Sequence, residues 1–145
     1  MKLKIEQSAC YEETEIDIRC KSLDEQIRQI IDIANRSTKA ITVKSDGASK
    51  IIKTQSIYYF ESVDEKTFVY CRDKVYSSDM KLYEAESLLI NTSFVRISKA
   101  CILNVDVLDS VRVLINGKME ALLLNGEKLI INRHYVPEFK KKFGM

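Results

Sequence analysis

Polar and apolar residues alternate along much of the chain, which is the pattern of half-buried strands. The alternating or β-branched and aromatic runs are residues 40–44, 49–53, 57–62, 67–71, 74–77, 109–115, 119–124 and 128–131. Asp46-Gly47, Asn116-Gly117 and Asn125-Gly126 separate pairs of these runs, and such dipeptides favour the positive φ of tight hairpin turns. The pattern therefore predicts a mainly β, antiparallel fold.

Helical spacing is predicted at three places on the periphery of this fold, which makes the class α+β. The best-marked helix follows Ser22-Leu23-Asp24-Glu25, a capping box in which Ser22 and Glu25 satisfy free backbone N–H groups. Its single apolar face consists of Leu23, Ile27, Ile30, Ile31 and Ala34. A short helix is expected at residues 82–89 and a terminal helix at residues 136–143, with Pro137 in its first turn.

The residues before the first helix carry two more strand patterns, at residues 2–6 and 15–19. We therefore expect a β-β-α appendage at residues 1–39 and a main domain at residues 40–145. The appendage is a candidate for dimerisation, for docking a regulatory partner such as a membrane protein, or for covering the sheet.

Composition places the chain among globular proteins, with 46% hydrophobic and 30% charged residues and a net charge of +2. The small net charge excludes strong bulk attraction to nucleic acid, so any basic site must come from local clustering. Four cysteines without a CxxC pair, and a single histidine, make a zinc site unexpected. No signal peptide or apolar run of membrane-spanning length is present, so we expect a cytoplasmic protein with reduced thiols.

Residues 94–104 form two apolar runs around a polar step that contains Arg96, Ser98 and Lys99. No carboxylate occurs between Glu86 and Asp106, so we expect Arg96 and Lys99 to have no local counter-ion. Such a turn is suited to a phosphate, although an ordinary strand-turn-strand with solvated bases has the same pattern. Lys140-Lys141-Lys142 also has two interpretations, because cations at a helix C-terminus offset the helix dipole and lysines also bind nucleic acid.

Catalytic chemistry has little support. A nucleophile and base pair would have to use His134, and Cys101 is its only candidate partner; Cys101 is also well suited to a buried strand position. We expect no enzymatic activity, no cofactor and no metal. What remains is one long donor at each of three turns between predicted elements: Lys66, Lys99 and Arg133.

From Ala40 to Phe143 the chain resembles LytTR DNA-binding domains, the output modules of many bacterial response regulators. The resemblance rests on the strand at residues 57–62, the helix with Leu82 and Leu88-Leu89, the segment Phe94-Val95-Arg96-Ile97-x-Lys99 followed by Ile102-Leu103-Asn104, the Asn116-Gly117 hairpin, and the ending Asn125-Gly126 with Arg133-His134-Tyr135. A receiver domain of ordinary size does not fit in some 40 residues. A stand-alone member is therefore expected.

The resemblance implies an elongated antiparallel fold that inserts loops into successive major grooves, with two copies on repeated sites. It implies base contacts at or next to Lys66, Lys99 and Arg133, flanked by Asn132 and His134, with Arg96, Ser98 and Asn104 contacting the DNA backbone or shaping the loops. Ser98 stands where many members carry His, and Asn132 where Ser is usual, so the preferred DNA sequence stays open.

The expected function is that of a sequence-specific, double-stranded DNA-binding transcriptional regulator that forms a homodimer, at least on DNA, and whose affinity falls steeply with salt. The alternative is a protein-interaction module or anti-regulator that keeps the fold and binds a regulatory partner through its N-terminal helix. No small-molecule substrate is expected in either case.

Overall fold

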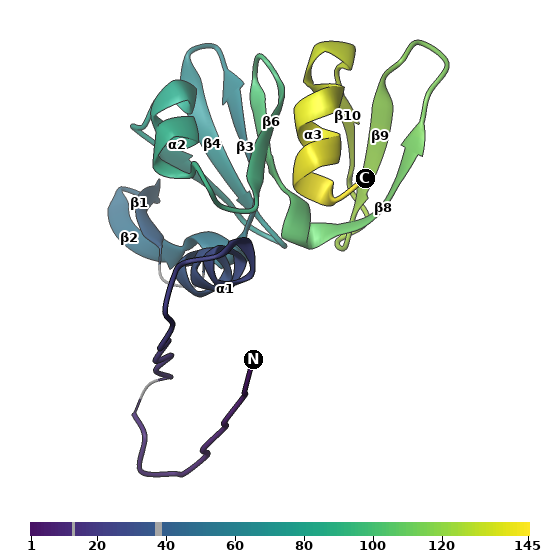
Figure 1. The fold of residues 1–145 in the computed structure, drawn as a ribbon. Helices are drawn as coiled ribbons and strands as arrows, with labels where there is room; N and C mark the ends of the chain where they lie inside the picture. Colours follow the sequence, from purple (N-terminus) through teal and green to yellow (C-terminus); the bar gives the residue numbers. More distant parts are fainter. Residues whose placement is uncertain (13, 37–38) are drawn as a thin grey trace.

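The computed structural model describes residues 1–12, 14–36 and 39–145, and its strands form two antiparallel sheets (Figure 1). The larger sheet has the order β2-β1-β5-β4-β3-β7-β6 and the smaller one the order β10-β9-β8. The strands are β1 (Ala40–Ser45), β2 (Ala48–Lys53), β3 (Ile57–Val63), β4 (Lys66–Cys71), β5 (Val75–Ser78), β6 (Phe94–Ser98), β7 (Cys101–Asn104), β8 (Leu108–Val113), β9 (Met119–Leu123) and β10 (Lys128–Ile131). The helices are α1 (Glu25–Arg36), α2 (Leu82–Leu88) and α3 (Val136–Phe143), with short 3-10 turns η1 (Thr54–Ser56), η2 (Val105–Val107) and η3 (Arg133–Tyr135). The predicted mainly β fold with peripheral helices is confirmed.

The three predicted hairpins are confirmed as β1-β2, β8-β9 and β9-β10. Gly117 has a φ of 74°, in the left-handed region that the second position of such a turn requires. The 114–118 tip is closed by the Leu114 N–H, which donates to the Lys118 carbonyl at 2.8 Å. The turn dipeptides thus set the connections of the smaller sheet.

The central strands of the larger sheet are covered on both faces. Residues 57–60 of β3 and all four residues of β7 are buried, so these strands lack the alternation of half-exposed strands. Phe60 lies in the apolar cluster beneath α2, whereas Tyr59 lies in a second cluster with the smaller sheet and Phe139 of α3. Helix α2 therefore covers one face of the larger sheet, and the smaller sheet with α3 covers the other (Figure 1).

At one end, the main chain joins the two sheets. The Asn132 N–H, just after β10, donates to the Ile97 carbonyl of β6 at 2.9 Å. This bond extends the pairing of the larger sheet's edge strand into the connection that leads to α3. It fixes residues 132–135 beside the end of β6.

At the opposite end, side chains make the connection. The Tyr59 hydroxyl donates to Glu127 Oε2 at 2.7 Å, and Asn125 Nδ2 donates to the Arg72 carbonyl at 3.1 Å. Tyr59 also stacks on Tyr70, with ring centroids 4.2 Å apart. Burial, followed by the Glu127 bond, raises the pKa of Tyr59 well above its usual range, so the phenol remains a donor.

Asn104, at the end of β7, is a structural residue inside the fold. It is 1% exposed, and its Oδ1 accepts from Ser93 Oγ at 2.8 Å and from the Asp106 N–H at 3.0 Å. Its Nδ2 donates to the Ile57 carbonyl at 2.9 Å. Of the sequence-derived roles, loop shaping is the one its burial supports, because a side chain enclosed in this way does not reach a ligand.

Replacing Asn104 with Ala leaves the Ile57 carbonyl and the Ser93 hydroxyl buried without these partners. We expect the free energy of unfolding to fall by about 2–3 kcal/mol, since each orphaned buried group costs ~1–3 kcal/mol. Urea denaturation followed by circular dichroism measures this. A loss within the ~0.5 kcal/mol typical of exposed positions would contradict the role.

The two strands expected at residues 2–6 and 15–19 of the appendage do not form, so this prediction is wrong. Residues 1–12 and 14–24 contain no strand, and Leu3, Ile5 and Ile16 are 85%, 80% and 59% exposed. These residues extend away from both sheets (Figure 1), so no neighbouring strand completes their hydrogen-bond ladder. Alternation alone did not produce a strand without a sheet edge beside it.

The start of the first helix also differs from the prediction. Helix α1 begins at Glu25, and the carboxylate of Asp24, not the hydroxyl of Ser22, accepts from the Ile27 N–H at 2.9 Å.

None of the helices in the described residues is long and apolar enough to cross a membrane. Helix α3 has the expected Pro137 in its first turn and ends at Phe143, followed by Gly144 as its C-cap with a φ of 87°.

Cys101 lies buried in β7, and burial, followed by the nearby Glu61, raises the pKa of its thiol to about 12. A thiolate is required for nucleophilic attack, so Cys101 is unsuited to the pairing with His134 that the sequence left open.

We expect the exposed Cys10 and Cys20 to react with a thiol reagent at pH 8, and Cys101 to react only after unfolding. Mass spectrometry of labelled peptides tests this, and rapid labelling of Cys101 in the native protein would contradict it.

Candidate nucleic-acid interface

Four turns lie at the same end of the molecule, at the top of Figure 1. They are residues 63–66 between β3 and β4, 98–101 between β6 and β7, 114–118 between β8 and β9, and 132–135 between β10 and α3. The Ser62 N–H donates to the Ala100 carbonyl at 2.8 Å, which joins the first turn to the second. The Asn132–Ile97 bond joins the second to the fourth. Lys66, Lys99 and Arg133 therefore lie on turns that share one end.

Lys66 is exposed and begins β4, after a tight turn in which Asp64 and Glu65 have φ values of 50° and 64°. Lys66 pairs with Val63 across this turn. The two carboxylates outnumber the lysine, so this turn attracts a polyanion less than the other turns do.

Arg96 holds the 98–101 turn in shape. Its Nε donates to the Ser98 carbonyl at 2.8 Å and its Nη2 donates to the Lys99 carbonyl. Its Nη1 lies 3.0 Å from Glu86 Oε2 of α2, so the expectation that Arg96 has no counter-ion is wrong. The chain brings this carboxylate back from ten positions upstream, because α2 packs near β6.

Ser98 supports the same turn, since its Oγ accepts from the Ala100 N–H at 3.1 Å. Lys99 differs from Arg96 and Ser98 in being exposed at the apex. The turn thus contains two residues that shape it and one that extends from it.

Arg133 is exposed in η3, and its aliphatic carbons lie over Gly117 of the neighbouring hairpin. A Cβ at position 117 would lie 3.2 Å from Arg133 Cδ, closer than ordinary packing allows. The adjacent His134 is also exposed and meets the Tyr135 ring edge to face, with centroids 5.1 Å apart. Asn132 accepts from the Tyr135 N–H at 2.9 Å through its carbonyl, which closes η3.

Two contacts at this end were not predicted from the sequence. They are the ion pair between Glu86 and Arg96 and the packing of Arg133 over Gly117. The Asn-Gly signal located the hairpin correctly but not its neighbour. For Glu86 no sequence signal existed, because the contact depends on how α2 crosses the sheet.

The lysines of α3 lie away from these turns. The helix begins next to η3 and runs toward the other end of the sheets (Figure 1). Lys142 Nζ donates to the Thr92 carbonyl at 2.8 Å, before the start of β6. Lysines in the last turn offset the helix dipole, which is the structural one of the two roles expected from the sequence.

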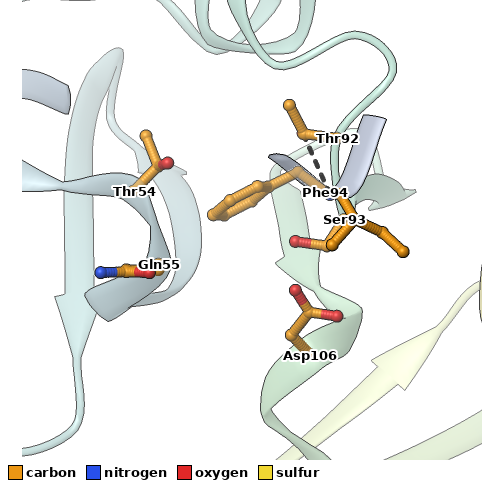
Figure 2. A pocket seen from close by; sticks show the side chains of 7 residues that line it. Thr54, Gln55, Thr92, Ser93, Phe94 and Asp106 are labelled. Carbon is orange, nitrogen blue, oxygen red and sulfur yellow. Dashed lines mark hydrogen bonds between the residues drawn. The ribbon is translucent and has the colours of Figure 1, made fainter. Parts of the chain in front are cut away.

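A pocket of about 380 Å³ lies at the end where β6 begins (Figure 2). Its lining residues are Ile33, Thr54, Gln55, Thr92, Ser93, Phe94 and Asp106. The Ser93 hydroxyl already donates to Asn104, and Thr92 Oγ1 accepts from the Phe94 N–H at 3.3 Å (Figure 2). The pocket lies at the opposite end of β6 from Lys99 and is separate from the four turns.

Among the described residues, no group of three or more His, Cys, Asp or Glu is arranged to hold a metal ion.

Relatives of this chain include proteins of two bacterial genera. The sensory transduction protein LytT of Enterococcus faecalis is 23% identical over 137 residues, which are 84% of this chain and 57% of that protein. The chain therefore spans little more than half of that relative's length. A Staphylococcus aureus protein named as an uncharacterized HTH-type transcriptional regulator, SAB2242, is 24% identical over 147 residues and is matched over 100% of this chain and 99% of its own.

Among solved structures, the fold matches the LytTr DNA-binding domain of a Bacillus cereus protein described as a methyl-accepting/DNA response regulator. The TM-score is 0.69 at 24% identity, covering 74% of this chain and 99% of that one. The family model for the LytTr DNA-binding domain matches residues 47–144. This range includes the turns at residues 98–101 and 132–135. The chain belongs to the LytTr DNA-binding domain family.

Proposed function

We propose that this protein is a transcriptional regulator that binds double-stranded DNA sequence-specifically and reads the major groove with the turns at residues 63–66, 98–101 and 132–135, which share one end of the molecule (Figure 1). Membership of a DNA-binding family supports DNA as the ligand. The observation that carries the proposed mode is the pair of main-chain bonds, Ser62 to Ala100 and Asn132 to Ile97, that join turns far apart in sequence. In this proposal the protein acts in the cytoplasm, without catalysis or a cofactor.

Lys99 and Arg133 are the central contacts in this proposal. Both are exposed, and both stand on turns whose backbone is held by hydrogen bonds. A lysine or arginine donates to O6 and N7 of guanine in the major groove, or to phosphate. Asn132 and His134 are proposed as neighbours of Arg133 at the same contact.

Arg96 and Ser98 act indirectly in this proposal, by presenting Lys99 at a defined angle. Lys66 is a peripheral contact, because Asp64 and Glu65 share its turn. Asn104 contributes only through the fold, since it is buried. The expected order of importance for affinity is therefore Arg133 and Lys99 first, then Lys66.

Arg133→Ala should weaken binding by about 1–3 kcal/mol if the contact is bidentate, and should relax specificity at one base pair. A duplex selected by the wild-type protein from a random library provides the probe, with affinity measured by fluorescence anisotropy at several salt concentrations. If Arg133 contacts phosphate instead, the slope of log K against log salt falls by about 1 without any change in preferred sequence.

The matched control is Arg72→Ala. Arg72 is an exposed arginine whose main chain lies at the opposite end, where its carbonyl accepts from Asn125. We expect its affinity and salt slope to equal those of the wild type. Equal losses from Arg72→Ala and Arg133→Ala would indicate attraction by overall charge and contradict the proposed site.

We propose further that α1 pairs two copies of the chain. Ile27, Ile30 and Ile31 are only half-buried, and none of the described side chains of α1 is fully buried. A helix of 12 residues is marginal in water unless its apolar face is covered.

Ile30→Glu should convert a dimer to a monomer, because it puts a carboxylate at the centre of that face. Sedimentation velocity at several concentrations, with and without a duplex carrying two repeats, measures the change. Gln29→Glu, at an exposed position of the same helix, is the control and should remain dimeric. A wild-type protein that stays monomeric on and off DNA would exclude this pairing and leave docking of another protein as the use of α1.

A further inference from the structure

We propose that the tip of the β8-β9 hairpin, residues 114–118, is an additional DNA-contacting element, and that Ile115 packs against the 5-methyl group of a thymine. This inference rests on the proposed function. It adds to the candidate contacts a hairpin whose residues the sequence marked only as a turn.

The tip lies directly beside a central proposed contact. The Arg133 Cδ and Cγ lie 3.2 and 3.4 Å from where a Cβ of Gly117 would be. The arginine stem and the hairpin backbone are therefore in contact, and the tip reaches the same end as the other three turns (Figure 1). A duplex that engages the Arg133 guanidinium must pass close to residues 114–118.

Ile115 is not packed against the part of the chain that the structure describes. Its side chain is 102% exposed, and Val113 on the same hairpin is 69% exposed, whereas Met119 and Leu123 on β9 are 1% exposed. An exposed apolar residue by itself is ordinary. At the apex of a hairpin that abuts Arg133, however, it presents an apolar surface to the ligand of that arginine.

The charges of the hairpin are also compatible with a polyanion. Residues 110–119 contain no carboxylate, and Lys118 is exposed at the tip. Glu120, the first acid beyond the tip, pairs with Arg112 at 3.0 Å. Phosphates therefore meet no free carboxylate at the tip itself.

The ligand group follows from the chemistry of the major groove. Among the base edges exposed there, only thymine carries a methyl group, and proteins read it through apolar contact. The side chains of arginine and lysine recognise guanine or phosphate, so an isoleucine beside Arg133 supplies a kind of recognition that the basic residues lack. The inference therefore assigns a thymine to the operator next to the base pair that Arg133 contacts.

The test is a double substitution, one in the protein and one in the DNA. A duplex selected by the wild-type protein is resynthesised with deoxyuridine replacing each thymine in turn, which removes only the 5-methyl group. At one position we expect wild-type affinity to fall about fourfold, the equivalent of ~0.8 kcal/mol for one buried methyl. Ile115→Ser should bind the thymine duplex about fourfold more weakly or worse, and should lose nothing further when that thymine is replaced.

Leu124→Ser is the matched control. Leu124 is also an exposed aliphatic residue, 54% exposed, but it follows β9 at the end opposite Ile115. It should retain wild-type affinity and wild-type sensitivity to deoxyuridine. Because Ile115 is fully exposed, Ile115→Ser should unfold at the wild-type temperature, which separates loss of binding from loss of folding.

Two results would overturn the inference. Wild-type affinity of Ile115→Ser for the selected duplex would remove the tip from the interface. A loss of affinity that is independent of every thymine methyl would show that Ile115 contacts something else. Failure of the proposed function is distinguishable from both, because the wild-type protein would then select no duplex at all.

Discussion

The packing of the smaller sheet against the larger one is the constraint on which the rest of the structure depends. It is fixed at both ends, by the Asn132 to Ile97 main-chain bond and by the Tyr59–Glu127 and Asn125–Arg72 bonds. Between these ends, the interior of the joint is apolar and includes Phe139. The joint sets where η3 stands relative to the 98–101 turn, and so the distance between the two central proposed contacts.

Within this frame, the polar residues divide into those that hold turns and those that extend from them. Arg96 uses its guanidinium on two carbonyls and on Glu86, so it is committed to the protein. Lys99 at the same turn remains exposed. Such a division is useful for reading a groove, because a contact made from a held backbone loses less conformational entropy on binding.

The positions of the candidate turns follow from the sequence, but the relative importance of their residues does not. Arg96 was grouped with the DNA-contacting positions because no acid lies near it in the chain, and α2 supplies one from a distance. Asn104 was included as a contacting or shaping residue, and its burial supports only shaping. Gly117 was found as a turn residue, whereas its packing against Arg133 depends on the joint between two sheets.

The sequence by itself determined the local structure: the three hairpin turns, the runs that become strands, the short helices and the family. These follow from φ preferences and hydrophobic periodicity, which act over a few residues. It did not determine whether residues 2–6 and 15–19 become strands, since a strand requires a neighbouring edge. Only the tertiary structure decided that, together with the partner of Arg96 and the shared end of the turns. Those features depend on contacts between residues far apart in the chain, which no local pattern encodes.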